Sequence, residues 1–107
     1  MDKSLIISSL VVKNTVHTTD SPPIAAGKRL VVVRVGMTDE SKGDKPSIVR
    51  LKFGGELIRT LCATTATVEL GVGKEYLGDG VKFLSVEREN AENSDKPITV
   101  WVDAYDK

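Results

Sequence analysis

The sequence is poor in cysteine and contains no long uninterrupted apolar stretch. A single cysteine, Cys62, excludes an internal disulfide and therefore the class of small secreted proteins held together by disulfides. No segment approaches the roughly 18 consecutive apolar residues that a membrane-spanning helix requires, so we expect no membrane partner. Residues 5–12 are apolar but include two serines, and no small-residue cleavage site follows them. We therefore expect synthesis in the cytoplasm without a signal peptide.

Aromatic residues are also scarce, with one tryptophan, two tyrosines and two phenylalanines among 107 residues. The core is therefore expected to be aliphatic and rich in valine. A hydrophobic fraction of 40% and a charged fraction of 28% are typical of a globular protein. This length predicts a single domain over residues 1–107.

Alternation of apolar and polar residues recurs along the chain, whereas no window longer than about ten residues shows convincing helical periodicity. The predicted strands are residues 4–13 (as one strand or two), 29–38, 47–53, 56–63, 65–70, 81–89 and 98–105. Residues 16–28, which contain Pro22 and Pro23, and residues 71–80, which contain four glycines, are predicted to be connections.

The Gly54–Gly55 pair lies between two of these strands and predicts a tight hairpin turn. Residues 56–63 are also compatible with a helix, but their threonine-rich continuation and the preceding glycines favour a strand. Seven or eight strands with such connections predict an all-β fold, an antiparallel β-sandwich of the immunoglobulin-like or jelly-roll type. A five-stranded closed barrel is a less suitable fold, because it would not include all seven or eight predicted strands.

Two segments of the chain resemble each other. Residues 43–53 read GDKPSIVRLKF and residues 94–104 read SDKPITVWVDA, so in each an Asp-Lys-Pro triplet precedes an alternating strand. Proline cannot donate to a β-ladder and is tolerated at the start of a strand. We interpret the repeat as two strands that start with the same residue types, because ten residues are too few to establish a duplication.

Candidates for catalysis and for metal binding are weak. His17 lies near Asp20 in a threonine-rich segment, which we interpret as an exposed loop, and Cys62 is expected to be an inert, buried thiol. The sequence has no nucleophile elbow, phosphate-cradling loop or paired histidine ligands. Its acidic loop residues lack the regular spacing of an EF-hand. We therefore expect neither an enzyme, nor a metal site, nor a cofactor.

The most distinctive candidate site lies in the last predicted strand. Ile98, Val100, Val102 and Ala104 form the apolar set there, so Trp101, Asp103 and Tyr105 are expected on the opposite, outward face. Two outward aromatic side chains flanking a carboxylate could stack a sugar ring or anchor a partner protein. The alternative is that a neighbouring segment covers this face, or that Trp101 belongs to the core.

Basic residues suggest a second candidate surface. Arg50 and Lys52 share one strand face, and a two-residue turn would place Arg59 directly opposite Arg50. Such like charges repel unless an anion lies between them, so Arg50, Lys52 and Arg59 could bind phosphates. The surface lacks interleaved aromatics for stacking bases, and a solvated sheet face is the simpler interpretation.

The formal net charge is zero, but residues 1–60 carry an excess of four basic groups and residues 61–107 an excess of four acidic ones. This asymmetry could favour association between copies, or it could cancel if strands from both halves interleave. The leading hypothesis is a non-catalytic, self-associating structural subunit, such as a phage or virus-like coat, decoration or tail component. The alternatives are a carbohydrate-binding module that uses Trp101 and Tyr105, or a nucleic-acid-binding protein that uses the basic strand face.

Overall fold

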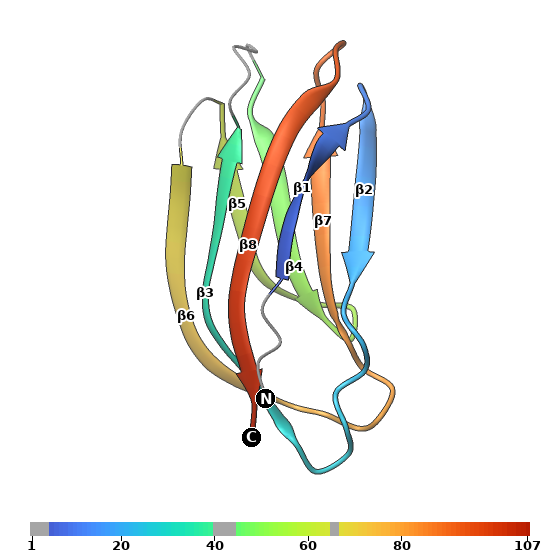
Figure 1. Ribbon diagram of the computed structural model, residues 1–107, viewed down its shortest axis with the longest axis vertical. Helices are drawn as coiled ribbons and strands as arrows, with labels where there is room; N and C mark the ends of the chain where they lie inside the picture. Colours follow the sequence, from blue (N-terminus) through green and yellow to red (C-terminus); the bar gives the residue numbers. More distant parts are fainter. Residues whose placement is uncertain (1–4, 40–44, 65–66) are drawn as a thin grey trace.

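The computed structural model describes residues 5–39, 45–64 and 67–107, which form eight β-strands and, within these ranges, no helix (Figure 1). In chain order the strands are β1 (Leu5–Val11), β2 (Thr15–Asp20), β3 (Arg29–Asp39), β4 (Ser47–Phe53), β5 (Glu56–Ala63), β6 (Thr67–Leu77), β7 (Leu84–Asn90) and β8 (Lys96–Asp106). The predicted all-β fold is confirmed.

The strands form two four-stranded antiparallel sheets that pack face to face. Sheet A has the order β1-β8-β3-β6 and lies in front in Figure 1, and sheet B has the order β2-β7-β4-β5 and lies behind it. The ladders pair β1 with β8, β2 with β7, β3 with β6 and β4 with β5. This nested pairing is that of one long hairpin rolled up on itself, which is the jelly-roll arrangement and not the immunoglobulin one.

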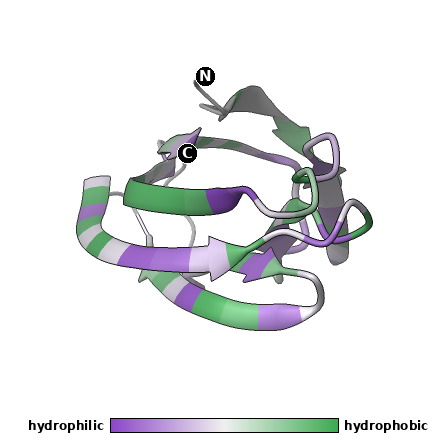
Figure 2. Ribbon diagram, turned by 90° about the horizontal axis from the view of Figure 1, so that it is seen from below, coloured by the Kyte–Doolittle hydropathy of each residue, from purple (hydrophilic) through white to green (hydrophobic). Residues whose placement is uncertain are grey.

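The core lies between the sheets and is aliphatic, as predicted. Strict alternation in β4, β7 and β8 places every second side chain in the interior. Figure 2, a view along the strands from below, shows the two sheets enclosing this interior. The buried set is dominated by valine and leucine and includes Val32, Val35, Val49, Leu51, Leu84, Val86, Val100 and Val102.

Two sequence predictions were wrong at sheet edges. Strand β2 covers residues 15–20, whereas the sequence predicts a connection over residues 16–28, because an edge strand needs only partial burial and threonine suits a pleated surface. Strand β6 continues to Leu77, through the glycines that suggested a loop. It is the outer strand of sheet A and is half-buried at most, so Gly71 and Gly73 remove little packing there.

The predicted Gly54–Gly55 turn is confirmed, with φ angles of 57° and 87°, and it joins two strands with the predicted bounds. The pairing beyond it differs from the prediction. A register shift between Leu51 and Lys52 places Arg50 opposite Thr60, so the expected pairing of Arg50 with Arg59 is wrong. A bulge of this kind inserts one residue and sends the following side chains to the other face.

The charge asymmetry along the chain is cancelled by the topology. Strands β7 and β8 come from the acidic half, and each lies between two strands from the basic half. Carboxylates of β7 and β8 therefore face basic side chains of β4 and β3 across adjacent strands. Interleaving therefore places opposite charges side by side on these strands.

Candidate binding surface

The outer face of sheet A carries the candidate residues of β8. Alternation buries Ile98, Val100, Val102 and Ala104 and leaves Trp101, Asp103 and Tyr105 on the outside, as the sequence predicts. Apolar side chains from the adjacent strands share this face. We call the resulting set the aromatic face, and it consists of Ile6, Leu10, Val31, Pro97, Trp101 and Tyr105.

The indole ring of Trp101 lies over strand β3, because the residue opposite Trp101 in that strand is Gly36, which has no side chain. A Cβ atom built on Gly36 would be only 2.3 Å from two carbon atoms of the indole ring and 2.6 Å from its Nε1. The ring therefore occupies the space that any other side chain would need, and this contact fixes its orientation. It is half-buried on the outer face and is not a core tryptophan.

Asp103 is engaged by a neighbouring cation. Its Oδ2 accepts from Nε of Arg34 at 2.8 Å, and Nη1 of Arg34 lies 3.4 Å from the carboxylate of Glu69 in β6. These side chains are about half exposed, so the ion pairs contribute little stability. Arg34 is therefore held between two carboxylates, and a ligand would meet a carboxylate of Asp103 that already has a partner.

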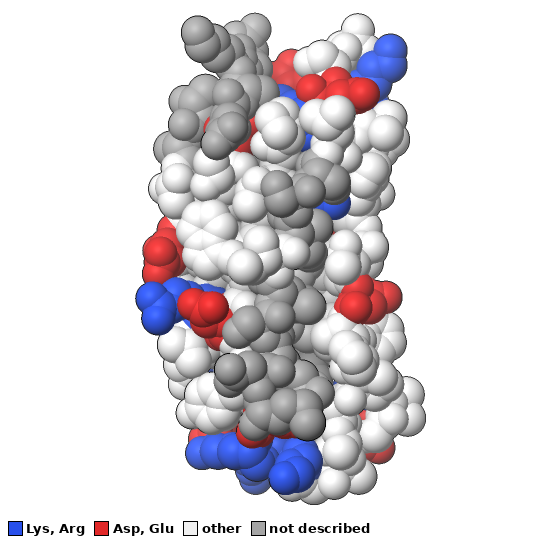
Figure 3. Space-filling view, in the orientation of Figure 1, with Lys and Arg blue, Asp and Glu red and all other residues white. Residues whose placement is uncertain are grey.

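The remainder of the aromatic face is uncharged. Ile6 is 80% exposed, Leu10 59% and Tyr105 39%. In the space-filling view of this side, the described part is mainly white, and the blue and red atoms gather at the ends and flanks (Figure 3). Several large apolar side chains exposed on one face of a small protein are typical of a site of interaction.

The outer face of sheet B differs sharply from the aromatic face. Arg50 lies 3.1 Å from the Glu89 carboxylate and 3.8 Å from that of Glu87, and Lys52 lies 2.8 Å from Glu87. Arg59 has a different register and lines a groove between β5 and β6 instead. The predicted basic surface of Arg50, Lys52 and Arg59 is therefore not formed, and two of its three members are neutralised by carboxylates.

The groove between the edge strands β5 and β6 has a volume of about 190 Å³ and contains Tyr76 beside Arg59 and Lys74. The Tyr76 ring packs on Phe53 with centroids 5.7 Å apart. Burial raises the pKa of Tyr76 above its ordinary value of 10.0, Glu56 raises it further, and Arg59 lowers it.

This arrangement predicts opposite shifts for two substitutions. Glu56→Gln should lower the pKa of Tyr76 and Arg59→Gln should raise it, as followed by ultraviolet absorbance during an alkaline titration. Because the folded-state pKa is the higher one, the neutral phenol contributes stability below pH 10.0 that is lost as pH rises through the folded-state value. A Tyr76 pKa that moved in the same direction in both variants would contradict these roles of Glu56 and Arg59.

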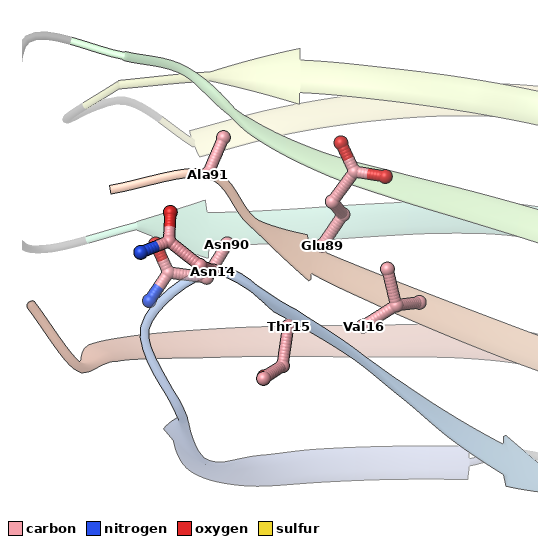
Figure 4. Close-up of a pocket in the computed structure, with 6 residues that line it drawn as sticks. All are labelled: Asn14, Thr15, Val16, Glu89, Asn90 and Ala91. Carbon is pink, nitrogen blue, oxygen red and sulfur yellow. The ribbon is translucent and has the colours of Figure 1, made fainter. Parts of the chain in front are cut away.

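A larger hollow, of about 330 Å³, lies beside the start of β2 and the end of β7. Its lining side chains point in different directions and do not converge on one point (Figure 4). Thr15 turns its hydroxyl to the carbonyl of Val12, and Glu89 is paired with Arg50. This hollow therefore has no set of polar groups aimed at a common ligand.

The remaining sequence candidates are dispersed. His17 lies in a strand, three residues from Asp20, so the two side chains point to opposite faces and form no acid–base pair. Cys62 is exposed, contrary to the prediction of a buried thiol, because alternation in β5 turns Leu61 and Ala63 inward instead. Within residues 5–39, 45–64 and 67–107, no three His, Cys, Asp or Glu side chains gather as metal ligands.

A buried polar cluster at one end of the sandwich was missed by the sequence analysis. It contains Asp39, Ser47 and Lys96, all at most 1% exposed. The Ser47 hydroxyl donates to Oδ2 of Asp39 at 2.6 Å, and Nζ of Lys96 lies 3.3 Å from the same oxygen. The signal was the second Asp-Lys-Pro triplet, whose lysine is the first residue of β8 and therefore starts the inward-facing set.

The chain was also compared with known proteins. No protein-family model matches it, and no curated protein matches it. The crystal structure of the Drosophila NLP core, a structure that gave insight into pentamer formation and histone binding by that protein, is similar with a TM-score of 0.43. The alignment has 16% sequence identity and covers 94% of this chain and 97% of the other. A likeness at this level supports no statement about partners.

In the part of the chain that the structure describes, no helix is long and apolar enough to cross a membrane.

Proposed function

We propose that this protein is a non-catalytic structural subunit that associates with further copies of itself through the aromatic face. The observation that carries the proposal is the contrast between its two outer surfaces. Sheet A exposes Ile6, Leu10 and Tyr105 beside the half-buried Trp101, whereas sheet B exposes Val16 and Leu57 beside a ladder of paired charges. A tryptophan that lies with large apolar side chains on one outer face is best explained by a partner that covers it.

Charge favours a second copy as that partner. Arg34 is paired with both Asp103 and Glu69 beside the aromatic face, and the one net negative charge of this exposed group is screened by salt between two such faces. A zero net charge also leaves little repulsion between whole subunits. A two-fold contact, in which the same patch is used by both copies, meets these conditions.

The setting we propose for such a subunit is a coat, decoration or tail component of a phage or virus-like particle. Support comes from fold class alone, since jelly rolls include viral capsid domains, and a fold does not determine a function. Assembly from many small identical subunits is compatible with a short chain of 107 residues.

A pair of lysine substitutions tests the self-association. Ile6 is 80% exposed on the aromatic face and Val81 is 73% exposed in the loop before β7, so neither change should disturb the fold. Ile6→Lys is expected to lower the molar mass measured by light scattering, because a charge would be buried in the contact. Val81→Lys is the matched control and should leave the mass unchanged. Equal masses for wild type and both variants would rule out this surface.

A second function, binding of carbohydrate, is favoured by the position of the indole ring. Trp101 is held over Gly36 on the outer face and lies on the same side of β8 as Tyr105, about 13 Å along the strand. Aromatic side chains that lie flat on a sheet can stack on sugar rings. A change of Trp101 fluorescence with added glycans, absent in a Tyr105→Ala variant at the same concentration, would favour this function over self-association.

A further inference from the structure

The two Asp-Lys-Pro segments meet in space at one end of the sandwich. The ammonium group of Lys96, from the second segment, donates a hydrogen bond of 2.8 Å to the backbone carbonyl of Lys45, from the first. The Lys45 amide donates in turn to the carboxylate of Glu92, and Oε1 of Glu92 lies 4.0 Å from Nζ of Lys96. The repeat therefore marks the two sides of one polar site.

The amine and the carboxylate at the centre of this site are both removed from water. Lys96 is the first residue of β8 and Asp39 the last residue of β3, and both point inward between the sheets. Their side chains are 1% and 0% exposed, and Nζ lies 3.3 Å from Oδ2. Asp39 pairs with Ile98, so Lys96 approaches diagonally across two adjacent strands.

We propose that Lys96 and Asp39 react to form an intramolecular amide bond, which closes this end of the sandwich covalently. The site holds a nucleophilic nitrogen beside a carboxyl group, with Nζ of Lys96 3.3 Å from Oδ2 of Asp39, and such lasting proximity makes a slow reaction between the two groups effectively unimolecular. The proposal is independent of self-association.

The reaction needs no co-reactant. The charged and neutral pairs differ only in the position of one proton. The neutral amine of Lys96 attacks Cγ of Asp39, a carbon–nitrogen bond forms, and one carbon–oxygen bond of the carboxyl group breaks. The departing hydroxyl takes a hydrogen from the nitrogen, so the products are the amide and one water molecule.

Neighbouring groups surround the two reacting side chains. The carboxylate of Glu92 lies 4.0 Å from Nζ, so it has to approach by about 1 Å to accept the proton that the nitrogen loses and return it to the departing hydroxyl. The hydroxyl of Ser47, 2.6 Å from Oδ2, can stabilise negative charge on that oxygen as the tetrahedral intermediate forms. The backbone carbonyl of Lys45 holds the nitrogen in place.

Intact-mass spectrometry of the purified, fully denatured protein tests the proposal. The wild type is expected to be lighter than its sequence mass by one water molecule, and Lys96→Arg should show its full mass. Peptide mapping should recover Asp39 and Lys96 in one branched peptide. The pair Lys52–Glu87 is an internal control, because its atoms are closer, at 2.8 Å, but its side chains are 30% and 21% exposed.

The role of Glu92 has its own test. Glu92→Gln should fold and yet lose water more slowly than wild type, as followed by mass during incubation of freshly made protein. A wild-type mass equal to the sequence mass after prolonged incubation, with Asp39 and Lys96 in separate peptides, would overturn the proposal. Loss of water in Lys96→Arg would place the reaction elsewhere and would overturn it as well.

Discussion

Compared with wild-type protein that has not yet lost water, Asp39→Ala is expected to lower the free energy of unfolding by about 3–5 kcal/mol, because it leaves Lys96 buried without the nearer of its two carboxylates. The hydroxyl of Ser47 would lose its acceptor at the same time. Chemical denaturation followed by Trp101 fluorescence measures the change. The expected loss is a large part of the total stability of a domain of this size.

Two comparisons make this result specific. Asp103→Ala removes a carboxylate from an ion pair that is about half exposed, so its effect should stay below about 1 kcal/mol. The double variant Asp39→Leu/Lys96→Met replaces the pair by apolar side chains and should recover most of the stability of the wild type before amide formation, since a buried ion pair contributes little net free energy over a hydrophobic pair. A loss in Asp39→Ala no larger than that in Asp103→Ala would contradict the importance of the cluster.

Replacing Gly36 by alanine is expected to destabilise the fold by about 1–3 kcal/mol and to displace Trp101. The new methyl group would start 2.3 Å from the indole ring, far inside van der Waals contact, so the ring must move off the sheet. The emission of Trp101 should shift to longer wavelength as the ring becomes more exposed to water. Denaturation and fluorescence spectra measure the two effects.

Gly71 provides the matched control for this substitution. It lies in β6 of the same sheet, and a Cβ atom built there would meet only a backbone oxygen at 4.0 Å. Gly71→Ala should therefore be neutral or slightly stabilising, because alanine has less conformational freedom in the unfolded chain. If both variants behaved alike, the contact between Trp101 and Gly36 would not be the feature that holds the ring.

The sequence predicted best those features that depend on neighbours along the chain. Alternation and the Gly54–Gly55 pair were sufficient for the β4–β5 hairpin, because a turn and its flanking strands are local. The outward position of Trp101 followed from the period of β8 alone. Edge strands were harder to predict from the sequence, because an edge strand needs less burial than a central one. Strand β2 therefore has few apolar residues, and strand β6 contains glycines.

Contacts between distant segments could not be predicted from the pattern. The bulge at Leu51 and Lys52 moved Arg59 away from Arg50, and nothing in the local alternation signals one extra residue. The meeting of Lys96 with Lys45 and Asp39 depends on the rolled-up order of the strands. The Asp-Lys-Pro repeat was interpreted only as a similar start of two strands, and the contact between Lys96 and Lys45 became visible only in the folded topology.

The measurement that tests the central claim most directly is the molar mass of the wild-type protein in solution, by light scattering on a sizing column at low and high salt. Self-association through an apolar surface predicts a discrete oligomer or larger particle whose mass is retained at high salt, because screening weakens charge pairs but not apolar contacts. A strict monomer of 11.6 kDa at both salt concentrations would contradict the claim.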